Sequence, residues 1–261
     1  MIGIFDSGLG GLTVAKAIMK RLPEYDVIYF GDTARTPYGS KSKQTVIQYS
    51  IENTKFLIKQ GAKFIVMACN TASSVATDIL RNQFDIPIFE VITPAVELTL
   101  KGHPLIVGII GTRATINSNV YVDKIKSYRP DIQVYGVACP LLVPLVEEGW
   151  LNKPETRMIA KKYLSSLKMR KIDTLILGCT HYPIIKSIIQ SKIGKRVRII
   201  DSAQAVADQV AAYLTYHEDS KPFCSQEGHY QFYVSDITPH FEQIAESIFN
   251  RHISLQLTPY A

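Results

Sequence analysis

Short apolar runs alternate along this chain with longer segments in which apolar residues recur every three or four positions. The short runs, rich in branched side chains, predict strands buried on both faces of a parallel sheet, and the longer segments predict amphipathic helices. The expected strands are 2–5, 27–30, 64–67, 88–91, 105–110, 174–177, 197–200 and 231–234, and the expected helices include 12–22, 43–60, 116–128, 154–167, 202–216 and 239–249. This alternation indicates the α/β class with largely parallel sheets.

Two parts of the chain resemble each other in three places at nearly one offset. Residues 2–5 resemble residues 107–110, the strand and proline-containing loop at 26–39 can be laid against 132–149, and two cysteines follow equivalent strands. Chance agreement between α/β units is the alternative. We expect two similar lobes, each a mostly parallel sheet flanked by helices, with the active site in the cleft between them. Lobe one should hold residues 1–92 and 207–261, and lobe two residues 93–206.

Composition and charge indicate a soluble globular protein. The chain has 261 residues, of which 46% are hydrophobic and 20% charged. It has no run of eighteen apolar residues and no basic-then-apolar leader, so we expect no membrane span and a cytoplasmic location. The net charge of +6 comes from lysines spread over the expected helices, without an aromatic-interleaved basic cluster, which argues against a nucleic-acid partner. A mild positive field would favour capture of an anionic substrate.

Four cysteines, Cys69, Cys139, Cys179 and Cys224, lie far apart in the sequence. No pair has the spacing of a zinc site or of a CxxC redox motif, so we expect reduced thiols and no metal. Cys139 precedes a proline in an apolar stretch, and Cys224 lies in a polar segment. We interpret these two cysteines as structural or incidental.

Cys69 and Cys179 each follow a buried strand and precede helix-compatible sequence. Open α/β sheets bind ligands at this edge, and a helix N-terminus favours a thiolate. A cysteine on a buried strand is most often a small core residue. Here, however, polar side chains follow each cysteine at once: Asn70, Thr71, Thr180 and His181. Such groups need a partner, and the carboxylate and ammonium of an amino acid would provide one.

Two equivalent thiols at facing strand ends allow three kinds of chemistry. They could form a disulfide relay, or one could be a nucleophile and the other a bystander. They could also act as acid and base on a carbon held between them, one removing a proton from one face while the other delivers a proton to the opposite face. That carbon would be inverted, and the sulfurs would stand roughly 7 Å apart, too far for a disulfide bond.

Other candidate residues have structural alternatives of their own. The glycine-rich turn after Asp6 has neither the spacing of a dinucleotide fingerprint nor the lysine of a Walker loop, which leaves a nucleotide-binding module as a minor alternative. Asp6 could instead cap the helix that follows this turn. His181 could be a ligand or a packing residue, and Glu147 a solvated helix residue. Tyr38 and Gly39 could form a plain turn.

Six short motifs stand in order along essentially the whole chain. They are FDSGLGGL at 5–12, GDTARTPYG at 31–39, ACNTA at 68–72, GTRAT at 111–115, VPLVE at 143–147 and LGCTHYP at 177–183. Together they resemble the glutamate racemases of the aspartate/glutamate racemase superfamily. A single motif would be modest evidence, whereas six at sensible spacing are very specific. Aspartate racemase is the rival interpretation within the same superfamily.

The resemblance implies a cofactor-independent enzyme that interconverts L- and D-glutamate, with the D-isomer going into bacterial peptidoglycan. It implies that Cys69 takes the α-proton from D-glutamate and that Cys179 takes it from L-glutamate. Asp6 and His181 would assist the adjacent thiols, with Glu147 as a further helper. The substrate-binding positions that the resemblance implies are Asp6, Ser7, Tyr38, Gly39, Asn70, Thr71, Thr115, Thr180 and His181. It also implies a homodimer.

Overall fold

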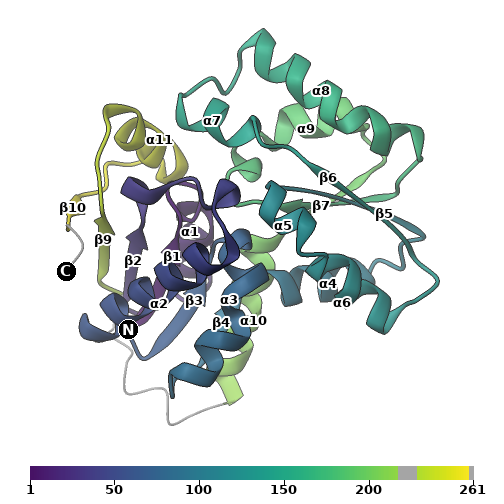
Figure 1. Cartoon of the computed structure of the whole chain (residues 1–261). Helices are drawn as coiled ribbons and strands as arrows, with labels where there is room; N and C mark the ends of the chain where they lie inside the picture. The colour runs from purple at the N-terminus through teal and green to yellow at the C-terminus, as the bar shows by residue number, and fades with distance from the viewer. Residues whose placement is uncertain (217–227, 259–261) are drawn as a thin grey trace.

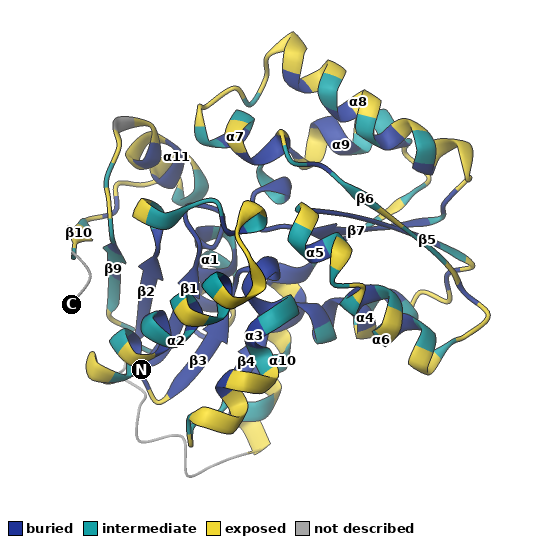
Figure 2. Cartoon of the chain, viewed as in Figure 1, coloured by how far each residue is buried: buried dark blue, intermediate teal, exposed yellow. Residues whose placement is uncertain are grey.

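The computed structural model describes residues 1–216 and 228–258, which form two parallel β-sheets flanked by helices (Figure 1). The α/β class with two sheets, expected from the sequence, is confirmed. Most strands are buried and the outward faces of the helices are exposed, so each sheet is a core layer between helices (Figure 2). Within the described residues, no helix is both long and apolar enough to cross a membrane.

The larger sheet has six strands in the order β10-β9-β2-β1-β3-β4, and every neighbouring pair is parallel. Its strands are β1 (Ile2–Asp6), β2 (Val27–Gly31), β3 (Phe64–Met67), β4 (Ile88–Glu90), β9 (Tyr230–Val234) and β10 (Leu255–Leu257). The sequence pattern does not predict β10, a short edge strand. Because β2 and β3 flank β1, the carboxyl ends of three buried strands meet at one edge of this sheet.

Helices cover both faces of the six-stranded sheet. One face packs against α1 (Leu12–Arg21), α10 (Ser202–Tyr216) and α11 (Pro239–Phe249), and the other against α2 (Lys43–Lys59) and α3 (Asn70–Gln83). The alternation of side chains along β1 explains this burial, because Ile2 and Ile4 point into one core and Phe5 into the other. A parallel sheet covered in this way has apolar residues on both faces.

The smaller sheet has four parallel strands in the order β6-β5-β7-β8. The strands are β5 (Ile106–Gly111), β6 (Gln133–Ala138), β7 (Thr174–Gly178) and β8 (Arg198–Asp201). One face packs against α4 (Ile92–Leu100) and α6 (Val120–Tyr128), and the other against α8 (Pro154–Met169) and α9 (Lys186–Ile193). Each lobe therefore repeats the same layered plan.

Short helical segments follow the carboxyl ends of the strands. They are α5 (Arg113–Asn117), α7 (Leu142–Glu147) and the 3-10 turns Thr33–Arg35, Tyr38–Ser40 and Tyr182–Ile185. Gly10, in the turn after β1, lies against Thr180, in the turn after β7. A Cβ at Gly10 would stand 2.4 Å from the Thr180 Oγ1 and 2.7 Å from the Thr180 carbonyl carbon. The lack of a side chain at Gly10 therefore lets the strand ends of the two sheets approach each other.

The two sheets also share an apolar cluster. It includes Ile4 of the larger sheet, Leu9 in the turn after β1, and Leu177 of the smaller sheet. α10 contacts both α1 and α4, and it continues without interruption through residues 206 and 207. The domain boundary expected between these two residues falls inside a helix, and the division of the chain into 1–92 with 207–261 and 93–206 stays a prediction.

Gly3 of β1 has no room for a side chain, because a Cβ there would lie 2.7 Å from the Ala62 Cβ. We predict that Gly3→Ala lowers the free energy of unfolding by about 1–3 kcal/mol, as overpacking of a core does. Urea denaturation measures the change. Gly136→Ala on the edge strand β6, where the nearest atom would lie 3.2 Å away, should cost less. An equal or larger loss at Gly136 would contradict this account of the packing.

Candidate active site

Cys69 and Cys179 line one cavity at the carboxyl ends of the two sheets. One residue, Ala68, separates Cys69 from the end of β3, and Cys179 directly follows β7. The cavity measures about 20 Å³, which is room for about one water molecule. The sequence-predicted residues that line it with the two thiols are Ser7, Tyr38, Gly39, Asn70, Thr71, Thr180 and His181. The structure brings these residues together around the paired cysteines.

Cys69 is buried at the N-terminus of α3, where its Sγ accepts a hydrogen bond from the Ala72 N–H at 3.5 Å. Burial and the neighbouring Asp6 carboxylate raise the pKa of this thiol to about 12, although the Ala72 N–H and the Ser7 hydroxyl act in the opposite direction. The expectation that the helix N-terminus favours a thiolate is wrong for Cys69, because burial outweighs the helix. Cys69 is therefore a thiol at neutral pH.

Cys179 lies at the start of a chain of three side chains. Its Sγ is 3.8 Å from the His181 Nδ1, and the His181 Nε2 is 3.0 Å from the Glu147 Oε1. Burial lowers the pKa of His181, but the Cys179 sulfur and the Glu147 carboxylate outweigh it and raise that pKa well above its usual value. The imidazolium form is thus favoured beside Cys179. Glu147 does not line the thiol cavity but stands behind His181.

Asp6 is fully buried beneath the cavity and does not line it. Its Oδ2 accepts hydrogen bonds from the N–H groups of Gly8 at 3.0 Å and Gly11 at 3.1 Å. These bonds hold the turn before α1, whose N-cap is Gly11, so Asp6 has a structural role in the turn and, among the described residues, accepts from no N–H group inside the helix. Its Oδ1 accepts from the Thr180 hydroxyl at 3.3 Å, across the two sheets. Burial raises the pKa of the Asp6 carboxyl, and His181 and the backbone donors oppose this rise.

Thr112 lines the cavity as well, although the sequence analysis did not single it out. Its Oγ1 lies 2.9 Å from the Thr71 Oγ1 and 3.1 Å from the Thr115 Oγ1. Thr115 is buried behind this wall and is not a lining residue. The three hydroxyls link α3 of the larger sheet to α5 of the smaller one. The signal that could have identified Thr112 is its position directly after a buried strand, in the motif at 111–115.

The loop that presents Tyr38 and Gly39 is held from behind by a polar network that sequence reasoning missed. The Arg35 Nε lies 2.7 Å from the Oδ2 of the buried Asp32 carboxylate, which also accepts a hydrogen bond from the Tyr38 hydroxyl. On the cavity side, a Cβ at Gly39 would stand 2.4 Å from the Thr112 Cβ. The loop therefore forms a fixed wall that touches the opposite lobe. The sequence signal for this network is the pair of oppositely charged residues, Asp32 and Arg35, within the motif at 31–39.

The described part of the chain also contains a third cysteine and other side chains of the types that ligate metals. Among residues 1–216 and 228–258, no group of three or more His, Cys, Asp or Glu side chains could hold a metal ion. Cys69, Cys139 and Cys179 carry free thiols, and Cys224 lies outside the described residues. The Cys139 carbonyl accepts a hydrogen bond from the Tyr182 hydroxyl at 3.1 Å, which fits a structural position for this buried residue.

The fold and the match to a protein family define the class of this protein. Residues 13–210 match the family model of the Asp/Glu/hydantoin racemases. The chain belongs to this family, and relatives of more than 40% identity are glutamate racemases, so it is an amino-acid racemase and therefore an isomerase.

Individual relatives narrow the comparison to glutamate racemases. The glutamate racemase of Geobacter metallireducens is 47% identical over 93% of this chain and 90% of the relative. The structure of a glutamate racemase isoform from Bacillus anthracis matches with a TM-score of 0.93 at 35% identity, covering 99% of this chain and 97% of that one. The Francisella tularensis glutamate racemase, solved in complex with D-glutamate, matches with a TM-score of 0.90 at 40% identity and the same coverage. The resemblance to glutamate racemases is confirmed.

The Glu147 carboxylate raises the pKa of His181, so removal of its charge should lower that pKa. We predict that Glu147→Gln moves the His181 titration midpoint to lower pH, because a neutral amide keeps a hydrogen-bonding partner but no longer stabilises the imidazolium. An NMR titration measures the midpoint, with the signal assigned by its loss in His181→Gln. Glu148→Gln, at the exposed neighbouring position, is the control. An unchanged midpoint in Glu147→Gln would contradict the charge coupling.

Proposed function

We propose that this protein interconverts L- and D-glutamate by a two-base transfer of the α-proton between Cys69 and Cys179. The observation that carries the proposal is that both cysteines line one cavity although they follow strands of different sheets. Two bases on opposite sides of one carbon invert it, which is the reaction of a racemase. The names of the relatives, and the D-glutamate bound to the Francisella tularensis enzyme, support glutamate as the substrate.

The electrostatic surroundings suggest which sulfur starts as the base. The pKa of about 12 keeps Cys69 protonated, and the His181 ring lies 3.8 Å from the Cys179 sulfur, with which it can exchange a proton. With L-glutamate, Cys179 removes the α-proton and Cys69 delivers its own proton to the opposite face. With D-glutamate the two cysteines exchange roles. In the substrate-free site Asp6 disfavours a Cys69 thiolate, and Glu147 acts through His181.

The residues around the thiols supply hydrogen-bond donors for the two carboxylates of the substrate and acceptors for its ammonium group. We assign the binding contacts to Ser7, Tyr38, Gly39, Asn70, Thr71, Thr180 and His181. Thr115 does not line the cavity and acts through the hydroxyls of Thr71 and Thr112. Asp6 acts through the Thr180 hydroxyl. Preorganised donors of this kind stabilise the negative charge that develops when the α-proton leaves.

The size of the cavity supports a cycle of opening and closing. A volume of about 20 Å³ is far too small for an amino acid, so the two lobes must separate to admit the substrate. Closure over the substrate excludes water, which strengthens the electrostatic interactions at the reacting carbon and protects a reactive thiolate. The contacts that must part during opening include Gly10 with Thr180 and Gly39 with Thr112.

The resemblance to glutamate racemases supports the remaining parts of the proposal. The enzyme works without a cofactor, and its D-glutamate serves the synthesis of peptidoglycan in cell-wall biogenesis. It acts in the cytoplasm as a homodimer.

Replacement of either sulfur should stop the reaction. We predict that Cys69→Ser and Cys179→Ser each lower the turnover of L-glutamate by about 10²–10⁴-fold, because serine is a much weaker acid and base at neutral pH. Polarimetry measures turnover, and circular dichroism checks that both variants fold. Cys139→Ala, which removes a thiol that does not line the cavity, is the matched control and should stay active. Wild-type turnover in either serine variant would refute the two-base scheme.

Incorporation of solvent deuterium tests whether the proton is exchanged at the α-carbon of glutamate. In D₂O, L-glutamate should give D-glutamate that carries deuterium at the α-carbon from the first turnover, because the exchanged Cys69 thiol delivers it. Mass spectrometry and chiral chromatography measure the label. A product that retains the original proton would contradict the mechanism.

With L-aspartate in a parallel assay, kcat/KM should be at least about tenfold lower than with L-glutamate, since the side-chain carboxylate of aspartate is one methylene closer to the α-carbon. A preference for aspartate would overturn the substrate assignment alone.

A further inference from the structure

The carboxamide of Asn70 has one unsatisfied half. Asn70 lines the thiol cavity, is 2% exposed and lies at the start of α3. Among the residues that the structure describes, its Nδ2 has no hydrogen-bond partner. A buried N–H group without a partner is costly in a folded protein, so its presence in a cavity points to a ligand atom that completes it.

The other half of the same carboxamide is held by Tyr121. The Tyr121 hydroxyl donates a hydrogen bond to the Asn70 Oδ1 at 2.6 Å. Burial and the Glu90 carboxylate raise the pKa of Tyr121 well above its usual value, so this hydroxyl keeps its proton and remains a donor. A carboxamide has an oxygen on one side and an NH₂ group on the other. With the oxygen fixed by Tyr121, the NH₂ group has a single orientation.

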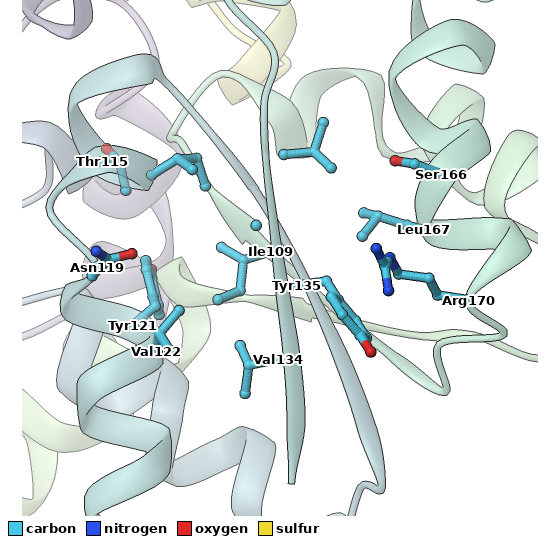
Figure 3. Close-up of a pocket in the computed structure, with 13 residues that line it drawn as sticks. Ile109, Thr115, Asn119, Tyr121, Val122, Val134, Tyr135, Ser166, Leu167 and Arg170 are labelled. Carbon is cyan, nitrogen blue, oxygen red and sulfur yellow. The ribbon is translucent and has the colours of Figure 1, made fainter.

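The ring of Tyr121 is itself fixed by packing. Tyr121 is 2% exposed and belongs to the apolar cluster between α6 and the smaller sheet. Its Cε2 would lie 3.4 Å from a Cβ placed at Gly178, the residue that directly precedes Cys179. Tyr121 also lines a cavity of about 440 Å³ in this lobe, together with Val122 and Tyr135 (Figure 3). The hydroxyl therefore reaches Asn70 from a buried ring of the lobe that carries Cys179.

We propose that Tyr121 is a positioning residue for the racemase: it orients the Asn70 carboxamide so that the Nδ2 donates to a carboxylate oxygen of the substrate. The inference rests on the proposed function and adds to it a residue that does not touch the substrate. Asn70 belongs to the larger sheet's lobe and Tyr121 to the smaller sheet's lobe. Asn70 thus takes up its binding orientation as the lobes close.

The test removes the hydroxyl and keeps the ring. We expect Tyr121→Phe to lower kcat/KM by about tenfold for both enantiomers of glutamate, because the carboxamide loses its fixed orientation. Tyr135→Phe is the matched control. It removes a tyrosine hydroxyl from the same lobe, one that bonds to Gln133 on its own strand, and it should leave kcat/KM unchanged. Circular dichroism and thermal melting check that both variants fold.

A double-mutant cycle separates positioning from general packing. If Tyr121 acts through Asn70, then Tyr121→Phe should cause no further loss in an Asn70→Ala background. The same tenfold loss in both backgrounds would overturn the inference, and so would an unaffected Tyr121→Phe variant of an active enzyme. A wild-type protein without glutamate turnover would instead refute the proposed function on which the inference rests, so the two failures are distinguishable.

Discussion

The contact of two backbone turns, Gly10 after β1 and Thr180 after β7, is the constraint on which the site depends. A Cβ at Gly10 would lie 2.7 Å from the Thr180 carbonyl carbon, which no side-chain rotation could relieve. The Thr180 hydroxyl reaches the Asp6 carboxylate at 3.3 Å in the same place, so steric and polar complementarity act together. Because both turns follow parallel strands, this contact aligns the carboxyl ends of two sheets, and Cys69 and Cys179 with them.

Two cysteines at equivalent positions stand in different electrostatic surroundings. A carboxylate lies near Cys69, whereas an imidazole lies near Cys179. Negative charge beside a thiol opposes its ionisation, and positive charge assists it. A similar arrangement of strands thus carries different charged neighbours beside the two thiols. That asymmetry arises from the turns after the strands, and the Glu147 side chain of α7 extends it from behind His181.

Much of the fold and part of the site could be predicted from the sequence. The α/β class and the cysteines at strand ends follow from local periodicity, because a short apolar run and the polar residues after it are neighbours in the chain. Tyr121 reaches the site through helix packing between two sheets, and no local pattern reveals such a contact. Thr112, by contrast, has a local signal in its position directly after a buried strand. The ionisation of Cys69 was predicted wrongly, since a helix start is visible in sequence whereas deep burial beside Asp6 is not.

The narrow space between the thiols has a practical consequence for inhibitor discovery. In this conformation it accommodates little more than a single water molecule. Docking of rigid compounds into such a space would reject every drug-sized molecule and the amino acid substrate alike. Gly39 and Thr112 leave no gap for even a methyl group between the lobes. Given the proposed separation of the lobes, screening campaigns against this enzyme should begin from an open conformer and select for compounds that keep it open.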